Sequence, residues 1–264
     1  MKSFLRILLS FVAAVQVSAG DTPVRLIAHR GGVVDDQIIE NNRAYIEAAV
    51  ERGYWMLEVD VRRTRDNVPI AHHDSTFQRY YEDRRSVGDL SWNEVSVLRA
   101  NPGGESPLRL SDYLAVCDGR VRIMLDIKSE KSPLPEKFLQ EIERVMREHG
   151  QLDQAYLIGA EEARQYFLGK LRVSGGYDDI VAARKRGEDV DSRYFYFPRG
   201  RTFTSDDIVR ALQLGVPVVP SINTFHYPAA ERMTQAREDI DRMRRGEVTE
   251  FQIDSIYDQW LLDE

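Results

Sequence analysis

Residues 54–61 read YWMLEVDV, and this stretch decides how the rest of the chain is interpreted. Glu58 and Asp60 are separated by one residue within a run that is otherwise apolar, which indicates a β-strand buried on both sides. Because side chains alternate between the two faces of a strand, both acids point the same way and their apolar neighbours point the other way. The stretch therefore predicts a buried strand that carries two carboxylates on one face.

A second stretch has the same design. Residues 121–128 read VRIMLDIK, so a strongly apolar run ends with Asp126 and Lys128 on one face. Carboxylates gathered at one place repel each other, and a divalent cation removes that cost. Hard oxygen ligands suit Mg²⁺ or Ca²⁺ better than zinc. The two stretches predict a site for one such cation, and the alternatives are solvated acids on an edge strand and a plain Asp126–Lys128 ion pair.

Strand-like and helical runs alternate outward from these two stretches. We expect strands over 24–29, 54–61, 68–73, 121–127, 154–158, 193–197, 216–222 and 250–254, and helices over 42–52, 133–148, 161–168 and 206–214. This alternation, with short connections and no linker, predicts parallel strands. Over about 245 residues it favours an α/β fold of the TIM (β/α)8 barrel type in a single domain. A doubly wound open sheet is the alternative, but no GxGxxG or Walker motif supports it.

Three histidines lie where predicted strands end. His29 follows the first strand, and His72 and His73 end the strand at 68–73. A single histidine is usually structural, whereas histidines at the ends of two strands beside a metal site favour a proton-transfer pair. His149 is expected to cap a helix, and the role of His226 stays open.

The composition limits the class of protein. Of the 264 residues 42% are hydrophobic and 30% are charged, as in a folded soluble domain, and the net charge of −7 has the wrong sign for a nonspecific nucleic-acid binder. The single cysteine, Cys117, excludes an intrachain disulfide framework.

The first nineteen residues have the pattern of a cleavable signal peptide. Lys2 and Arg6 precede an uncharged, mainly apolar run over 7–17, and small residues follow it. We expect cleavage after Ala19, a domain over 20–264, a periplasmic or secreted location and no stable membrane anchor. The alternative is an amphipathic first helix.

Several ordered motifs resemble those of the glycerophosphodiester phosphodiesterases. The matching segments are His29-Arg30-Gly31, Glu40-Asn41-Asn42, Glu58-Val59-Asp60, the run 66–74 that ends in His72-His73-Asp74, Asp126-Ile127-Lys128, Ile222-Asn223 and, loosely, Ile253-Asp254. The family is a TIM barrel, so the resemblance implies the same fold that the strand pattern favours. Its register makes His73, rather than His72, the catalytic match.

The resemblance also implies a chemistry. A metal held by Glu58, Asp60 and Asp126 would lie beside His29 and His73 as general acid and base, with Arg30 and Lys128 on the substrate phosphate and Glu40 and Asn223 in support. The substrate would be a small glycerophosphodiester, cleaved to glycerol 3-phosphate and an alcohol. Which histidine acts first as the base, the identity of the alcohol and the oligomeric state stay open.

Some positions depart from the family pattern. Asp126 replaces a glutamate, Asn42 replaces a threonine, and Tyr80 and Tyr81 stand where small threonines are common and could narrow the leaving-group side. Two alternatives therefore remain: a phospholipase D-type enzyme that acts on lysolipid or sphingolipid phosphodiesters, and a barrel that binds phosphorylated ligands without turnover.

Overall fold

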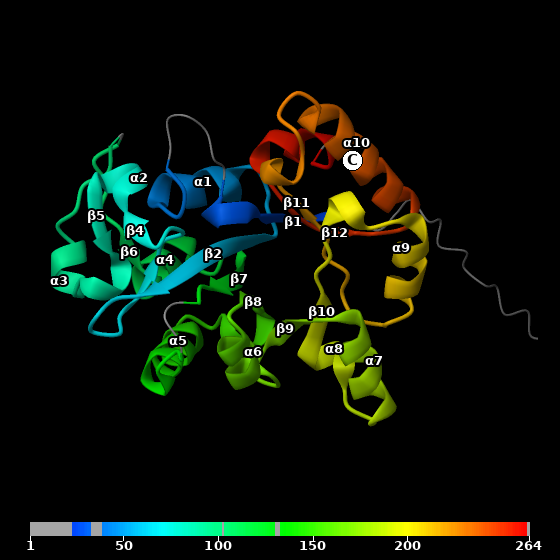
Figure 1. The fold of residues 1–264 in the computed structure, drawn as a ribbon, viewed down its shortest axis with the longest axis horizontal. Coiled ribbons are helices and arrows are strands. Elements are labelled where there is room, and N and C mark those ends of the chain that lie inside the picture. The colour runs from blue at the N-terminus through cyan, green and yellow to red at the C-terminus, as the bar shows by residue number, and fades with distance from the viewer. Residues whose placement is uncertain (1–22, 33–38, 102, 130–132, 263–264) are drawn as a thin grey trace, which may run out of the picture.

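Eight parallel strands form a ring at the centre of the computed structural model, which describes residues 23–32, 39–101, 103–129 and 133–262 (Figure 1). Around the ring the order is β10-β9-β8-β7-β2-β1-β12-β11. Isolated parallel bridges, Tyr196 with Val218 and Arg199 with Ser221, join the two end strands and close the ring. The strands are β1 (Arg25–Ala28), β2 (Met56–Arg63), β7 (Arg122–Ile127), β8 (Tyr156–Gly159), β9 (Arg172–Gly175), β10 (Tyr194–Tyr196), β11 (Ser221–Ile222) and β12 (Glu250–Ile253).

Helices follow the strands and lie outside the ring (Figure 1). They are α1 (Arg43–Glu51), α4 (Leu110–Cys117), α5 (Glu136–Glu148), α6 (Glu161–Phe167), α7 (Tyr177–Lys185) with the short α8 (Val190–Arg193), α9 (Ser205–Leu212) and α10 (Arg232–Arg245). The predicted TIM barrel is therefore confirmed, and the closed ring excludes the doubly wound open sheet.

One predicted strand has a different place from the one expected. Residues 68–73 were expected to continue the parallel series, but β3 (Pro69–Ala71) pairs antiparallel with β2. A tight turn explains this, because the Thr64 hydroxyl donates to Asp66 while the Val68 amide donates to Thr64 Oγ1, which sends the chain straight back.

The segment that begins at β3 inserts between β2 and α4. It contains β4 (Thr76–Phe77), α2 (Gln78–Tyr81), β5 (Asp83–Ser86), α3 (Trp92–Val95) and β6 (Leu108–Arg109), and it has a small apolar core of its own around Phe77. The segment places α2 beside the carboxyl ends of the barrel strands, where Tyr80 lines a cavity with His29.

Two apolar layers fix which way the strand side chains point. Leu57, Val59 and Val61 lie in the larger core between the ring and the helices, whereas Met56 and Met124 lie in a second cluster. That second cluster fills the barrel interior with residues of β1, β2, β7, β8 and β10 and with Val219, just before β11: Ile27, Met56, Met124, Tyr156, Ile158, Phe195 and Val219. The alternation predicted for 54–61 is thus present, and Glu58 and Asp60 point into the barrel above an apolar floor.

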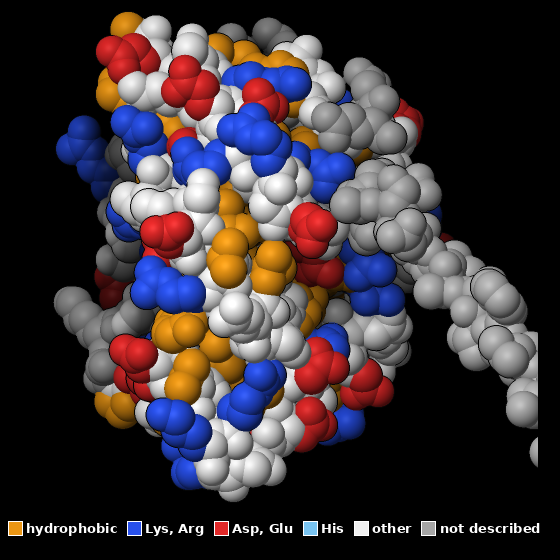
Figure 2. All heavy atoms as spheres, turned by 90° about the vertical axis from the view of Figure 1, so that its right-hand side faces the viewer, with side chains coloured by type: hydrophobic (Ala, Val, Ile, Leu, Met, Phe, Trp, Pro, Cys, Tyr) orange, Lys and Arg blue, Asp and Glu red, His pale blue; other side chains and the backbone are white. Residues whose placement is uncertain are grey.

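The outer surface carries both signs of charge. On the face at the right of Figure 1, acidic and basic side chains are interspersed with several small apolar patches (Figure 2). Two exposed apolar side chains, Val209 and Leu212, belong to α9. Among the helices of the described residues, none combines the length and the apolar character that crossing a bilayer requires.

Candidate active site

Three carboxylates meet where neighbouring strands β2 and β7 end. Asp60 and Asp126 are register partners across the β2–β7 pair, and Glu58 lies two residues before Asp60 on the same face. Oxygen atoms of Glu58, Asp60 and Asp126 lie within 4.8 Å of one another. Glu58 and Asp60 are each only 1% exposed, so water cannot separate these charges.

Gly159 at the end of β8 makes room for this cluster. A Cβ atom at this position would lie 2.3 Å from the Ile127 carbonyl oxygen and 2.6 Å from Asp126 Oδ1. The backbone of Gly159 also has φ of +100°, which side chains disfavour. The glycine therefore allows the strand end to approach Asp126 closely.

Lys128 lies between two of the carboxylates. Its Nζ is 2.6 Å from Asp60 Oδ1 and 2.5 Å from Asp126 Oδ2. Burial alone would raise the pKa of Asp60, but the Lys128 ammonium and the His73 ring outweigh it and lower that pKa. Glu58 has no ion pair among the described residues, and burial together with Asp60 and Asp126 raises its pKa well above the usual range. The cluster thus holds more negative charge than one ammonium neutralises, which suits a cation site.

A strained turn places Arg30 beside the cluster. The residues His29–Gly31 form a 3₁₀ turn (η1) in which Arg30 has φ of 58° and ψ of 36°. A left-handed conformation costs a residue with a side chain about 1 kcal/mol. The Arg30 amide donates to Glu58 Oε2 at 2.6 Å, and the guanidinium donates to Glu40 Oε2 at 3.0 Å. The turn therefore holds the carboxylate cluster and the arginine together.

Residues 40–42 form hydrogen bonds that hold this turn, the carboxylate cluster and α1 in place. Glu40 is buried and accepts from both Arg30 and Arg79. Asn41 Nδ2 donates to Asp60 Oδ2 at 2.8 Å. Asn42 is the N-cap of α1, since its side chain accepts from the Tyr45 amide at 3.0 Å. Asn42 thus serves the capping role that a threonine could serve, so this departure from the family pattern has a structural explanation.

His29 lies next to a partly buried carboxylate. Its Nδ1 lies 2.5 Å from Asp254 Oδ1, while Asp254 Oδ2 accepts from the Thr224 amide at 2.6 Å. Burial alone would raise the pKa of Asp254, but its hydrogen bonds with His29 and Thr224 outweigh it and lower the pKa to about 2. Asp254 is therefore ionised at neutral pH and holds the His29 ring by one nitrogen, which leaves Nε2 for other partners.

His73 has a carboxylate partner of its own. His73 Nδ1 lies 2.7 Å from Asp74 Oδ1, and Arg79 Nε lies 2.8 Å from Asp74 Oδ2. These contacts with His73 and Arg79 lower the pKa of Asp74 against the opposing effect of burial. His73 and His29 thus have the same side-chain arrangement, although Asp74 shares its charge with an arginine.

His72 has a structural role. It is 6% exposed, its Nε2 lies 2.9 Å from the Thr76 carbonyl oxygen, and its ring packs against Phe77 at a tilt of 30°. Burial lowers the pKa of His72 to about 4, so the ring is neutral near pH 7. His73, in contrast, lines the cavity at the mouth of the barrel, which agrees with the register that made His73 the catalytic match.

Two adjoining cavities open at the carboxyl ends of the strands. The mouth cavity has a volume of about 300 Å³ and is lined by residues that include His29, Arg30, His73, Asp126, Lys128 and Asn223. The side cavity has a volume of about 250 Å³ and is lined by Tyr80, Phe225 and Ile256, among others. His29, Arg30 and Phe225 line both cavities. The barrel thus brings the predicted residues to one place.

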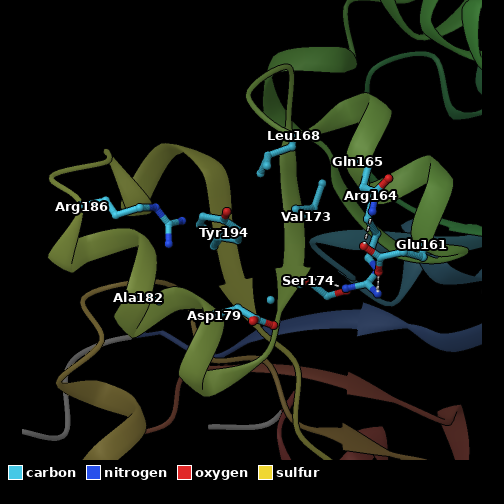
Figure 3. A pocket seen from close by; sticks show the side chains of 11 residues that line it. Glu161, Arg164, Gln165, Leu168, Val173, Ser174, Asp179, Ala182, Arg186 and Tyr194 are labelled. Carbon is cyan, nitrogen blue, oxygen red and sulfur yellow. Dashed lines mark hydrogen bonds and ion pairs between the residues drawn. The ribbon is translucent and has the colours of Figure 1, made fainter.

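Another hollow lies outside the ring, between α6 and α7 (Figure 3). Its volume is about 260 Å³. Arg164, which lines it, already donates to Glu161 and to the Ser174 carbonyl oxygen. None of the predicted site residues lines this hollow, so the mouth of the barrel is the candidate active site.

Comparison with known proteins agrees with this geometry. The model of the glycerophosphoryl diester phosphodiesterase family matches residues 29–173, which is more than half of the chain. The chain belongs to this family. The match begins at His29 and includes both strands that carry the carboxylates. Family members are phosphoric diester hydrolases that depend on a metal, and the Glu58–Asp60–Asp126 cluster provides the oxygen ligands that such a metal needs.

Individual relatives extend the comparison. The chain is 36% identical over 96 residues to glycerophosphodiester phosphodiesterase 1 of Rattus norvegicus, which is 36% of this chain and 28% of the relative. It is 29% identical over 134 residues to lysophospholipase D GDPD1 of Homo sapiens, which is 47% of this chain and 42% of the relative. The matches thus span less than half the length of these relatives.

A solved structure supports the fold over nearly the whole chain. The structure of a glycerophosphoryl diester phosphodiesterase from Silicibacter pomeroyi superposes with a TM-score of 0.69 at 19% identity and covers 92% of this chain and 94% of that one. At this identity the likeness concerns the fold alone.

Several side chains that contact the predicted site residues were not predicted to do so. Asp254 was noted only as a loose motif match, and Asp74 and Asn41 were quoted without a role. The position of Asp254 directly after a strand, like that of His29, is the signal that could have identified it. Arg79 carried no such signal, because it reaches the site from α2 in the inserted segment.

Proposed function

We propose that this protein hydrolyses glycerophosphodiesters to glycerol 3-phosphate and an alcohol. One observation carries the proposal: two carboxylate-backed histidines, His29 and His73, line the same cavity as Arg30, beside a buried cluster of acidic side chains. A negatively charged phosphate can bind an arginine there while two imidazoles exchange protons with its ester oxygens.

The residues divide the chemistry between them. Each histidine donates its Nδ1 hydrogen to a carboxylate, so its bare Nε2 is the nitrogen that can accept a proton. One imidazole takes the proton of the glycerol 2-hydroxyl, whose oxygen attacks phosphorus, and the other imidazole, protonated, donates to the departing alcohol. In the second half of the reaction the roles reverse as water opens the cyclic phosphate. Arg30 binds and orients the phosphoryl oxygens throughout.

The metal would be one Mg²⁺ or Ca²⁺ ion held by Glu58, Asp60 and Asp126. When bound, such an ion neutralises charge on the phosphoryl oxygens. Lys128 lines the mouth cavity and already contacts two of these carboxylates, so it would both fix their positions and lie within reach of the phosphate.

The test is turnover by single-histidine variants. His29→Ala and His73→Ala should each lower kcat by at least about 100-fold, as removal of a general acid or base does. His149→Ala, at the end of α5, is the matched control and should retain wild-type turnover. A chelator should abolish turnover, and Mg²⁺ or Ca²⁺ should restore it. Near-normal turnover in both site variants would refute the mechanism, and a wild-type protein that binds diesters without turnover would be the ligand-binding barrel instead.

We also propose that the protein is exported. The signal-like segment 1–19 supports this and lies outside the described residues. Expression of the full chain followed by mass spectrometry of the N-terminus should give a protein that begins at Gly20. A protein that retains Met1 in the cytoplasm would refute the proposal.

A second candidate is a phospholipase D-type activity on lysolipids. The side cavity favours it, because Phe225 is 62% exposed and Ile256 is 40% exposed next to Tyr80. Exposed apolar side chains beside an active site suit an apolar substrate. Comparing kcat/KM for glycerophosphocholine with that for lysophosphatidylcholine decides between the two, since only the second carries an acyl chain.

A further inference from the structure

A group of polar side chains lines the mouth cavity on strands other than the two that carry the acidic cluster. Arg199 follows β10, Asn223 follows β11, and Gln252 belongs to β12. In the strand order, β10 is four strands from β2, and β11 is four strands from β7. Arg199 and Asn223 therefore face the acidic cluster from the opposite wall, and Gln252 lies on the strand next to Asn223. The proposed reaction gives Arg199 and Gln252 no role, and the family resemblance gives Asn223 only a supporting one.

Arg199 differs from the other cations of the site. Arg30 pairs with Glu40, Arg79 pairs with Glu40 and Asp74, and Lys128 pairs with two aspartates. The guanidinium of Arg199 is exposed and has no hydrogen-bond or ion-pair partner within the ranges that the structure describes. Its charge nevertheless reaches His226, which lines the same cavity. Burial lowers the pKa of His226, and the charges of Arg199 and His29 lower it further.

Asn223 offers a buried donor to the same cavity. It is 2% exposed and precedes η5 (Thr224–His226). Its backbone is held there, because its carbonyl oxygen accepts from the His226 amide at 2.9 Å and its own amide donates to His226 Nδ1 at 3.4 Å. No partner for Asn223 Nδ2 exists among the described residues. An unpaired buried donor costs about 1–3 kcal/mol, which a ligand acceptor would recover.

Gln252 offers a buried acceptor beside this donor. It is 3% exposed and lines the cavity, and its Oε1 has no partner in the described part of the chain. The three side chains together present a free cation, a donor and an acceptor. This combination matches a group that carries negative charge and has a hydroxyl or ammonium group close by.

We propose that Arg199, Asn223 and Gln252 form a second recognition subsite, which selects phosphodiesters whose alcohol arm carries an anionic group of its own. Arg199 binds the anion, Asn223 donates a second hydrogen bond to it, and Gln252 accepts from the adjacent hydroxyl or ammonium group. A phosphate on Arg30 can direct its other arm into the side cavity, since Arg30 lines both cavities. This inference rests on the proposed hydrolytic function and adds to it the class of alcohol.

The test uses substrates that differ by one charged group. Glycerophosphoserine differs from glycerophosphoethanolamine only in a carboxylate, and phosphoglycerol compounds with and without a terminal phosphate make the second pair. Wild-type kcat/KM should be higher for the anionic member of at least one pair, and the two pairs show whether carboxylate or phosphate is the preferred anion. Arg199→Gln should reduce that preference by about tenfold, the lower end for a charge-assisted hydrogen bond because Arg199 is exposed.

The controls separate this inference from the proposed function. Arg201→Gln removes an exposed arginine two residues away and should leave the preference unchanged, whereas Arg199→Gln should lower kcat/KM more for the anionic member of a pair than for the member that lacks the anionic group. An equal wild-type rate on both members of both pairs, or an unchanged preference in Arg199→Gln, would overturn the subsite. If no diester is hydrolysed, the proposed function fails; calorimetric binding of the same pairs to wild type and Arg199→Gln then decides the subsite by the same criterion.

Discussion

Substitution of Asp254 tests how the site fixes the orientation and the tautomer of His29. Asp254→Asn keeps the size and shape of the side chain but removes the negative charge next to His29 Nδ1. The amide can still accept a hydrogen bond at one atom, but at the other it presents NH₂ to the Thr224 amide, which now donates to a carboxylate oxygen. An asparagine at this position can therefore satisfy the hydrogen bond to His29 or the one from the Thr224 amide as they now stand, but not both.

The structure indicates the size of the effect. A hydrogen bond to a charged group is worth about 1.5–3 kcal/mol, and 1.4 kcal/mol corresponds to a factor of ten. Loss of this contact should lower kcat/KM by about 10- to 150-fold. If the amide keeps its oxygen on Thr224, its NH₂ faces His29 and stabilises the wrong tautomer, which can cost up to about 10⁴-fold in a serine-protease triad. We expect a loss of about 100-fold, mostly in kcat.

The assay is release of glycerol 3-phosphate from glycerophosphocholine over a range of pH. If Asp254 only stabilises the fold, the melting temperature should fall and the pH profile of kcat should keep its shape. If it orients His29, the limb of the profile that reports His29 should move while the protein remains folded. Asp241→Asn, on the exposed face of α10, is the control. An unchanged kcat and pH profile in Asp254→Asn would refute the reasoning.

Two further predictions concern the support of the site. Gly159→Ala should destabilise the fold by about 1–3 kcal/mol, because the added Cβ clashes with Ile127 and Asp126, and it should weaken divalent-cation binding measured by calorimetry. Gly169→Ala is the control, because Gly169 has φ of +85° but open space around it. Equal effects of the two substitutions would contradict the clash. The folded pKa of His72 of about 4 lies below its ordinary value of 6.5, so the unfolded chain binds this proton first as the pH falls. The free energy of unfolding should therefore fall by about 3 kcal/mol between pH 6.5 and pH 4 because of His72. In urea unfolding, His72→Gln should lose less stability than the wild type over this range. The same dependence of unfolding free energy on pH in both proteins would contradict the prediction.

The barrel was predictable because its strongest signals are local. Residues 54–61 and 121–128 show their buried faces in the sequence itself, and both became adjacent parallel strands. In contrast, α10 (Arg232–Arg245) was not predicted, because its charged residues conceal a narrow buried stripe of Ala236, Ile240 and Met243. The strand expected over 216–222 is shorter in the structure, since β11 contains only Ser221 and Ile222. Val218 pairs with Tyr196 of β10 through an isolated bridge and not as part of a continuous strand.

The part of the candidate site that lies at the ends of neighbouring strands was predictable from the sequence. Glu58, Asp60 and Asp126 meet because β2 and β7 are neighbours, which follows from the barrel topology. The position of Asp254 after a strand marked it as a candidate, but its pairing with His29 could not be predicted, since Asp254 is 225 residues away and reaches His29 only because β12 pairs with β1. Long-range partners of this kind are set by ring closure, which no local pattern carries.

The two histidines differ in how firmly their carboxylates are committed. Asp254 has no ion pair with an arginine or lysine among the described residues, whereas Asp74 also binds Arg79. Arg79 binds Glu40, which in turn binds Arg30, so the charge behind His73 is linked to the residue that would hold the phosphate. A change in phosphate binding can therefore reach Asp74, the partner of His73, through three successive ion pairs, whereas Asp254, the partner of His29, interacts with Arg30 through charge alone. Substitutions along this chain of contacts should combine non-additively, because each removes a partner that the next one needs.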